Sequence, residues 1–401
     1  MVLPATLKSA SGGAEAGEID AEVGVVARRG HARADERVGL TSIPYWLMHV
    51  VALGVCFVPF SWGLVGLCVG LYYLRMFGIT AGYHRYFAHR GYKTGRVFQF
   101  VLAWLGTMSS QKGVLWWSGH HRHHHRYSDM EEDIHSPKRG FWWSHQTWFL
   151  VPRFDRTAEA QLREFRSYPE LAFLDRHWWI GPTSLGVATL VIGGLPAFLW
   201  GFVLSTVLLW HGTFTINSLA HVWGSRRYPT TDTSRNNFFL ALITMGEGWH
   251  NNHHHYQSTA NNGFFWWEID LSYNITAGLN TVVSYGRRTA KQADGLVPFG
   301  QPDETFSALA RYQVPSGPLK GASALWSYTW WGDSTLSTRT NWKMPPGDVH
   351  NLVLGYRWKK YSLGLRVENI LDQLSLRPSV NETAVGVMNH RNYRFAVSRT
   401  W

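Results

Sequence analysis

The apolar positions of the chain form two long runs that are typical of membrane-spanning helices. Residues 43–81 are almost continuously apolar, with no Lys or Arg before Arg75. Residues 177–221 contain no Lys, Arg, Asp or Glu. About 20 residues of helix cross the hydrocarbon core of a bilayer. Each run is therefore long enough for two spans, and the pattern predicts four transmembrane helices with turns near Pro59 and Pro196.

After Tyr273 the period of the pattern changes from helical to alternating. Apolar and polar residues alternate over 352–358 and over 361–367, with two lysines between these runs. The same period of two recurs over 324–330 and 393–397. Runs of this period separated by turn residues indicate antiparallel β-strands, and about six strands fit between this point and the C-terminus.

The predicted fold is an all-α integral membrane domain followed by an antiparallel β fragment. Residues 1–40 are rich in Gly, Ala, Glu and Arg without an apolar period, which predicts a disordered tail. Residues 41–273 are expected to hold the four transmembrane helices and a cytoplasmic helical cap, with a short interfacial helix over 97–111. Residues 274–401 hold the predicted strands. No apolar segment follows the charged start, so no signal peptide is expected.

The distribution of charge predicts which side of the membrane the connecting segments face. Residues 82–176 carry 14 Lys and Arg, whereas the two predicted hairpin turns carry none. The positive-inside rule therefore places residues 82–176 and 222–273 in the cytoplasm and the chain in the inner membrane. The net charge is +11, but no basic stripe with interleaved aromatics appears. Anionic lipid headgroups are the expected counter-charge, and no nucleic-acid partner is expected.

Histidines form three short clusters on this one predicted face. Five of them fall within the six positions 120–125, and the spacing H-x-x-H-H of residues 121–125 recurs at residues 250–254. The first cluster is the pair His84 and His89. Neutral imidazole is the commonest protein ligand of transition metals. A His-rich surface tract or an expression tag would explain one such cluster, but three clusters separated by apolar spans predict a single metal site.

Residues 40–273 resemble the integral-membrane fatty acyl desaturases of the delta-9 type. The resemblance rests on H-R-Y-F-A-H at 84–89, W-W-S-G-H-H-R-H-H-H-R-Y-S-D at 116–129 and G-E-G-W-H-N-N-H-H at 246–254. It implies an oxidoreductase that uses O2 as co-substrate and a di-iron centre to insert a cis double bond into a saturated acyl chain. An unactivated methylene requires a strong oxidant, which dioxygen activated on iron supplies and no side chain does.

The resemblance also implies a set of nine histidine ligands for two Fe ions. They are His84, His89, His121, His124, His125, His221, His250, His253 and His254. Asn217 lies one helical turn before His221 and would hold a metal-bound water. His84 and His89 lie about 140° apart round an α-helix, which predicts that they bind different metals.

Other polar residues near the motifs are expected to support the ligands or to lie outside the set. Glu247 and Asp129 are candidates to orient ligand imidazoles, and a solvated loop acid is the alternative for each. His120, His123 and His255 are surplus to the pattern. His120 stands where many animal relatives have Asp beside the substrate headgroup, so the resemblance leaves recognition of CoA open.

The resemblance further implies a tunnel for the acyl chain beside the second span. Cys68 and Tyr72 are the candidate lining residues, with ordinary lipid-facing packing as the alternative. Tyr72 lies about 18 Å before His84 along a straight helix, so it would close the tunnel beyond the reactive carbons. The acyl carrier is left open between CoA, a carrier protein and a lipid. No H-P-G-G haem motif occurs, so the expected electron donor is a separate ferredoxin or cytochrome-b5-type protein with its reductase.

The C-terminal strands resemble the last strands of a TonB-dependent outer-membrane receptor barrel. The resemblance rests on alternating aromatics, V-E-N-I-L-D at 367–372 and the terminal Trp401. A transmembrane barrel needs at least about eight strands, so six would leave open edges. We therefore expect a receptor fragment fused to a desaturase near 270–278. Two other functions stay open, namely a related di-iron membrane hydroxylase or alkane oxygenase and an inactive chimera.

Overall fold

The chain folds into two compact units in the computed structural model. The structure describes residues 37–156, 163–287, 302–317, 319–335, 343–374, 376–378, 385–387 and 390–399. The predicted tail up to residue 36 and the terminal Trp401 lie outside these residues. The first unit runs to Phe264 and includes Glu268–Ser272, and the second comprises Phe265–Trp267 and the chain from Tyr273 onward.

The first unit is helical. Its longer helices are α2 (Ile43–Ala52), α3 (Trp62–Phe77), the π-helix η4 (Gly78–Ala88), α4 (Arg96–Thr107), α5 (Val114–Tyr127), α7 (Pro169–Arg176), α8 (Ile180–Ala197), η10 (Phe198–Leu204) and α9 (Ser205–Asn217). Shorter helical segments are η3 (Leu53–Phe57), η6 (Trp143–Thr147), α6 (Arg163–Arg166), α10 (Leu219–Val222), α11 (Phe238–Ile243) and α12 (His250–His255). The interfacial helix predicted over 97–111 corresponds to α4. The helix α13 (Leu271–Gly278) begins in this unit and ends in the second.

Three helical segments of the described chain are long and apolar enough to cross a membrane. They are Leu40–Phe57, Trp62–Ala88 and Ile180–Val222. The third has 43 residues, about twice the length of one crossing. This segment breaks at Gly194, which has a φ of 66° and lies two residues before Pro196. Glycine adopts this left-handed backbone without a Cβ clash, and proline cannot continue the hydrogen-bond ladder. The four predicted spans therefore correspond to three segments, the last of which is interrupted where the turn was predicted.

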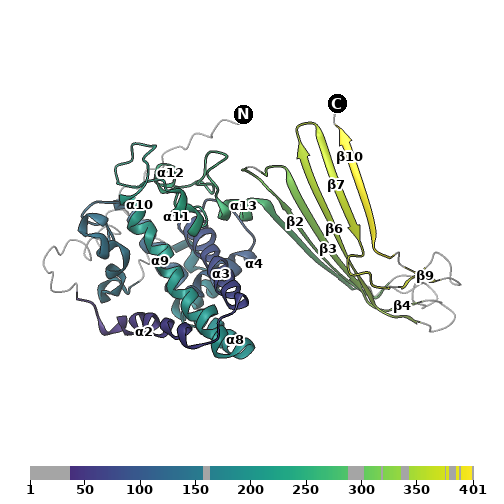
Figure 1. Ribbon diagram of the computed structural model, residues 1–401, viewed down its shortest axis with the longest axis horizontal. Helices are drawn as coiled ribbons and strands as arrows, with labels where there is room; N and C mark the ends of the chain where they lie inside the picture. The colour runs from purple at the N-terminus through teal and green to yellow at the C-terminus, as the bar shows by residue number, and fades with distance from the viewer. Residues whose placement is uncertain are drawn as a thin grey trace. The chain divides into compact units, whose positions relative to one another are not determined.

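The spanning helices pack against one another and leave the histidine-bearing segments together. The helix α3 packs against α4, η10 and α9, and α5 packs against η4 and α7. Figure 1 shows α10, α11 and α12 gathered at one end of the helical unit. At the contact between η4 and α4, a Cβ on Gly78 would lie 2.5 Å from the backbone of α4. The glycine therefore permits the close approach that fixes the start of η4.

The second unit is an open antiparallel sheet, which confirms the predicted period of two. Its order is β1-β2-β3-β6-β7-β10 (Figure 1), formed by Leu279–Arg287, Glu304–Gln313, Ala322–Trp331, Gly347–Trp358, Tyr361–Glu368 and Asn392–Arg399. Two short pairs are β4 (Ser334–Thr335) with β5 (Lys343–Met344) and β8 (Leu376–Pro378) with β9 (Val385–Val387). The turn between β6 and β7 contains Lys359 at a φ of 53°. Among the described residues, the edge strands β1 and β10 pair on one side only, so the sheet is not closed.

Candidate metal centre and cavity

The first histidine motif lies on a π-helix. The amide of His89 donates to the carbonyl of His84 at 3.1 Å, the i→i+5 bond of this helix type. Residues five apart therefore lie one above the other, and the two imidazole centroids are 4.7 Å apart. The expectation that the two histidines bind different metals is wrong for this geometry, because it assumed the narrower turn of an α-helix.

The nine histidines predicted as ligands come together in two adjoining groups. In the first group, ring nitrogens of His84, His89, His121, His125 and His253 all lie within 4.8 Å of one another. In the second, the same holds for His124, His221 and His254. His250 adjoins this second group, with its Nε2 at 3.2 Å from Nε2 of His221. The α-helix α5 supplies both groups, because His121 and His125 point to one and His124 to the other.

Buried carboxylates lie behind four of these imidazoles. The Nδ1 atoms face carboxylate oxygens in the pairs His84–Glu247 at 2.8 Å, His124–Asp133 at 3.0 Å, His254–Asp232 at 2.7 Å and His221–Asp129 at 3.6 Å. A carboxylate at Nδ1 fixes the imidazole tautomer and turns Nε2 toward a metal. Glu247 and Asp129 are buried, so neither is a solvated loop acid. Asp133 and Asp232 escaped the sequence analysis, because no spacing rule links them to their histidines.

The electrostatics of the groups suit binding of a cation. Burial lowers the pKa of His121, His125, His250 and His253 well below its usual value, so each offers a neutral nitrogen at pH 7. Burial opposes charge on His124, but the carboxylates of Asp133, Asp129 and Asp232 together outweigh it and raise the pKa of that histidine. A positive charge at its Nε2 is therefore favoured, whether it is a proton or a metal.

The residues present fit a metal centre. The Nε2 of His254 is buried and has no hydrogen-bond partner among the described residues, while its Nδ1 is bound to Asp232. Such an orphaned nitrogen is costly unless something binds it. A donor set made of imidazoles, without thiolate, suits iron among the transition metals.

The surplus histidines lie outside both groups. His120 Nδ1 is 2.8 Å from the carbonyl of Trp116, and His123 Nε2 is 2.8 Å from the carbonyl of Glu132. His255 stacks on Tyr228 at a centroid distance of 4.2 Å. Each of these contacts accounts for its imidazole without a metal.

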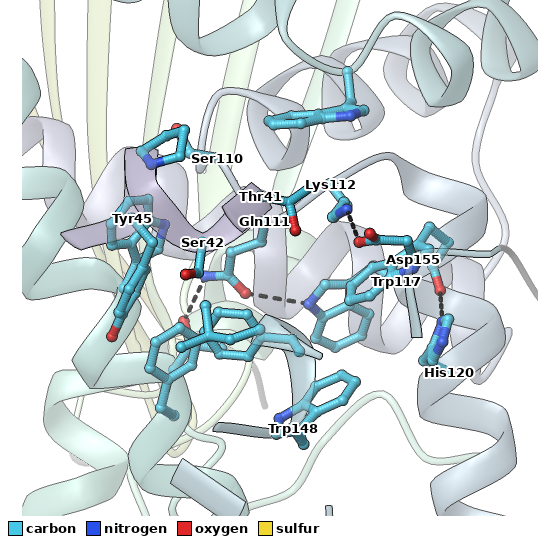
Figure 2. Close-up of a pocket in the computed structure, with 18 of the residues that line it drawn as sticks. Thr41, Ser42, Tyr45, Ser110, Gln111, Lys112, Trp117, His120, Trp148 and Asp155 are labelled. Carbon is cyan, nitrogen blue, oxygen red and sulfur yellow. Dashed lines mark hydrogen bonds and ion pairs between the residues drawn. The ribbon is translucent and has the colours of Figure 1, made fainter. Parts of the chain in front are cut away.

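An apolar cavity of about 480 Å³ reaches the first histidine group at His121. His121 and Asn217 line it, together with aromatic side chains that include Tyr45, Trp116, Trp148, Trp210 and Phe214. Figure 2 shows the ion pair of Lys112 with Asp155 at 2.6 Å on the lining, where Asp155 is exposed.

A hydrogen-bonded polar group faces the cavity beside His121. The carboxamide of Gln111 accepts from Nε1 of Trp117 at 3.2 Å (Figure 2) and donates to the hydroxyl of Thr213 at 3.0 Å. The sequence analysis missed both Gln111 and Thr213. They lie 102 positions apart, and no local pattern joins them.

The cavity does not follow the predicted tunnel. Neither Cys68 nor Tyr72 lines it. The Tyr72 hydroxyl instead donates to the carbonyl of Ile243 at 2.8 Å and ties α3 to α11. Met48 on α2 and Phe202 on η10 also line the cavity. Both also pack against a buried cluster formed by Ala52, Leu199 and Val203.

Apolar helices long enough to span a membrane, clustered buried imidazoles and an apolar cavity define a membrane protein with a candidate metal centre. The fatty acid desaturase family model matches residues 38–269. The sn-2 palmitoyl-lipid 9-desaturase of Nostoc sp. (strain 36) is 38% identical over 53% of this chain and 77% of its own. The chain therefore belongs to the fatty acid desaturase family and is an oxidoreductase.

Other relatives differ in the position of the double bond. The sn-1 stearoyl-lipid 9-desaturase of Anabaena variabilis is 37% identical over 56% of this chain and 84% of its own. The acyl-CoA C20 Delta5-desaturase of Anemone leveillei is 36% identical over 51% of this chain and 66% of its own. Among solved structures, the ferripyoverdine receptor of the Pseudomonas aeruginosa outer membrane covers 30% of this chain and 17% of its own, at 19% identity and a TM-score of 0.26. A likeness at this level carries no argument.

Proposed function

We propose that the chain is a di-iron, O2-dependent acyl desaturase that introduces a cis double bond at the delta-9 position of a saturated fatty acyl chain. The observation that carries the proposal is the pair of imidazole groups, of which His121 also lines an apolar cavity. One Fe would be held by His84, His89, His121, His125 and His253, and the other by His124, His221, His250 and His254, with Asn217 beside a bound water. Iron held there would supply activated dioxygen, the oxidant that the reaction needs.

The chain's own residues bind and order the acyl chain. The aromatic lining excludes water from the acyl chain, and Gln111, held by Trp117 and Thr213, contacts it beside His121. Asp133 and Asp232 accept the Nδ1 hydrogens of His124 and His254 and so keep the Nε2 atoms of these rings available. The length of cavity between this point and Met48 sets how many carbons lie beyond the reacting pair. The delta-9 position is supported by relatives whose names specify 9-desaturation of lipids.

We also propose the domain bounds, the membrane location and the electron donor. Residues 41–273 would be the membrane desaturase domain, preceded by a tail over 1–40 and followed by a barrel-like segment over 274–401. The 14 Lys and Arg of residues 82–176 support an inner-membrane location with the centre facing the cytoplasm. Electrons would come from a separate ferredoxin or a cytochrome-b5-type protein with its reductase. The acyl carrier stays open among lipid, CoA and carrier protein, since relatives named for lipid and for CoA substrates both match.

Fatty-acid profiling in a desaturase-deficient host tests the proposal. Expression should produce acyl chains with one cis double bond, and the purified protein should contain about two irons per chain. A hydroxylated product would instead support the related membrane hydroxylase or alkane oxygenase. Full activity of protein that carries only zinc, or no metal, would rule out the di-iron centre.

A further inference from the structure

Three histidines outside the two groups form a continuous hydrogen-bonded chain. Nε2 of His49 on α2 lies 3.0 Å from Nε2 of His211 on α9. Nδ1 of His211 lies 2.9 Å from Nε2 of His145 on η6. The chain ends at the carbonyl of Tyr45, 2.8 Å from His49 Nδ1, and at the hydroxyl of Ser218, 2.9 Å from His145 Nδ1. Every ring nitrogen of the three imidazoles therefore has a partner.

The carbonyl at one end fixes the direction of all these hydrogen bonds. The Tyr45 carbonyl can only accept, so Nδ1 of His49 carries a hydrogen and Nε2 of the neutral ring accepts. His211 then donates through Nε2 and accepts through Nδ1, and His145 does the same in turn. At the end of the series the single hydrogen of the Ser218 hydroxyl has two acceptors at 2.9 Å, namely Nδ1 of His145 and the carbonyl of Phe214. Burial lowers the pKa of His145 to about 4, in agreement with a neutral ring at pH 7.

The other end of the chain lies at a helix break beside the candidate metal centre. The helix α9 ends at Asn217 and α10 begins at Leu219, and Ser218 between them has φ −117° and ψ −75°. Its side chain is fully buried. His211 and Ser218 are seven residues apart, about two turns along one face of a helix. His145 bridges them, and so holds the last turns of α9 at the point where the helix stops.

We propose that His49, His211 and His145 position the helix break at Ser218, and through it direct Asn217 and His221 toward the second histidine group. The inference rests on the proposed metal-binding function. The three histidines touch neither substrate nor metal and are therefore positioning residues. Without them, the Ser218 hydroxyl keeps only its hydrogen bond to the Phe214 carbonyl, and the hydrogen-bonded link from α2 and η6 to the helix break is lost. The backbone between Asn217 and His221 then relaxes.

Metal content after loading with Zn²⁺ alone tests this without any need for turnover. His145→Phe keeps a ring of similar size but removes both nitrogens, and it should lower the bound metal from about two to about one per chain. His145→Gln can still donate to His211 and accept from Ser218, so it should retain two. His177→Phe is the matched control, because it also removes a histidine that packs against an aromatic side chain. This variant should retain two metals.

Milder changes keep the test decisive if His145→Phe fails to fold. His49→Leu, at the far end, should weaken binding at the second group by about 10- to 100-fold. Ser218→Ala combined with His49→Leu should lose no more metal than the larger loss of the two single variants, since both break one hydrogen-bonded chain. If wild type binds two metals and all these variants do as well, the positioning role is wrong. If wild type binds none, the proposed function itself fails.

Discussion

The two units of the chain differ in how far they bury their charged and apolar side chains. In the helical unit, charged groups are buried and paired: the guanidinium of Arg85 lies 2.9 Å from Glu247 and 2.8 Å from Asp270. In the sheet, most residues of β1 and β10 are exposed. The apolar side chains buried within the described part of the sheet are Trp331, Met344 and Val349. The helical unit thus encloses an interior, whereas the sheet presents open faces and edges.

The difference shows which unit is built to hold a site. Glu247 accepts from Arg85 through one oxygen and faces His84 Nδ1 with the other. The same carboxylate therefore belongs both to the scaffold and to the candidate metal centre. Asp270, near the end of this unit, pairs with the same arginine. A sheet without such an interior needs lipid or further strands to cover its apolar side chains.

The largest effect is expected from removing histidines, and it should depend on the unit. His253 belongs to the first group, and its Nε2 lies within 3.0 Å of Nε2 of both His84 and His125. His253→Ala should therefore reduce turnover to background with loss of iron. His350→Ala in β6 is the control and should leave iron content and turnover unchanged. Elemental analysis and product profiling of both variants measure this. A His253→Ala enzyme that keeps two irons and full activity would contradict the ligand assignment.

A comparison of ion pairs sharpens the contrast in stability. Arg85→Met leaves two buried carboxylates without their cation and should destabilise the helical unit by about 3–5 kcal/mol. Arg366→Met in β7 removes a half-exposed arginine 3.0 Å from Glu368, and should cost at most about 1 kcal/mol. Thermal unfolding of each variant in detergent gives both numbers. Equal losses of stability in the two variants would mean that burial of an ion pair does not determine how much it stabilises its unit.

The sequence predicted the helices, the strands and the histidine motifs well, but it predicted poorly the contacts that join distant segments. Helical spans and β-strands follow from apolar periodicity, and the nine histidines follow from spacing and resemblance. The π-helix does not, because a wide turn leaves no separate signature in the apolar period, and this misassigned His84 and His89. Asp133, Asp232 and the Gln111–Thr213 bond depend on tertiary packing, which no local pattern records. The interrupted third segment was predicted because Pro196 marks it directly.

A smaller effect is expected at the two ends proposed for the substrate cavity. Met48→Ala shortens a side chain that lines the cavity and should shift preference toward longer acyl chains without moving the double bond, if Met48 limits the length of the chain. Tyr72→Ala tests the tunnel predicted from sequence and would shift chain length only if the acyl chain runs beside α3. Fatty-acid profiles of both variants, each with normal iron content, separate the two. A shift in Tyr72→Ala alone would show that the cavity at Met48 does not hold the chain end.

The smallest effect is expected from deleting the sheet. No member of either histidine group lies beyond residue 254, whereas Asp270 pairs with Arg85 and the Ser272 hydroxyl lies 2.6 Å from that of Thr80. A chain ending at Gly278 keeps these contacts, and it should retain full iron content and desaturation. Its yield should stay equal or rise, because exposed strand edges promote aggregation. A chain ending at Phe264 loses both contacts and should lose stability and activity, which makes it the matched control. If the chain ending at Gly278 is inactive while the full chain is active, the sheet contributes to the enzyme, and the contrast between a site-bearing unit and a dispensable one is wrong.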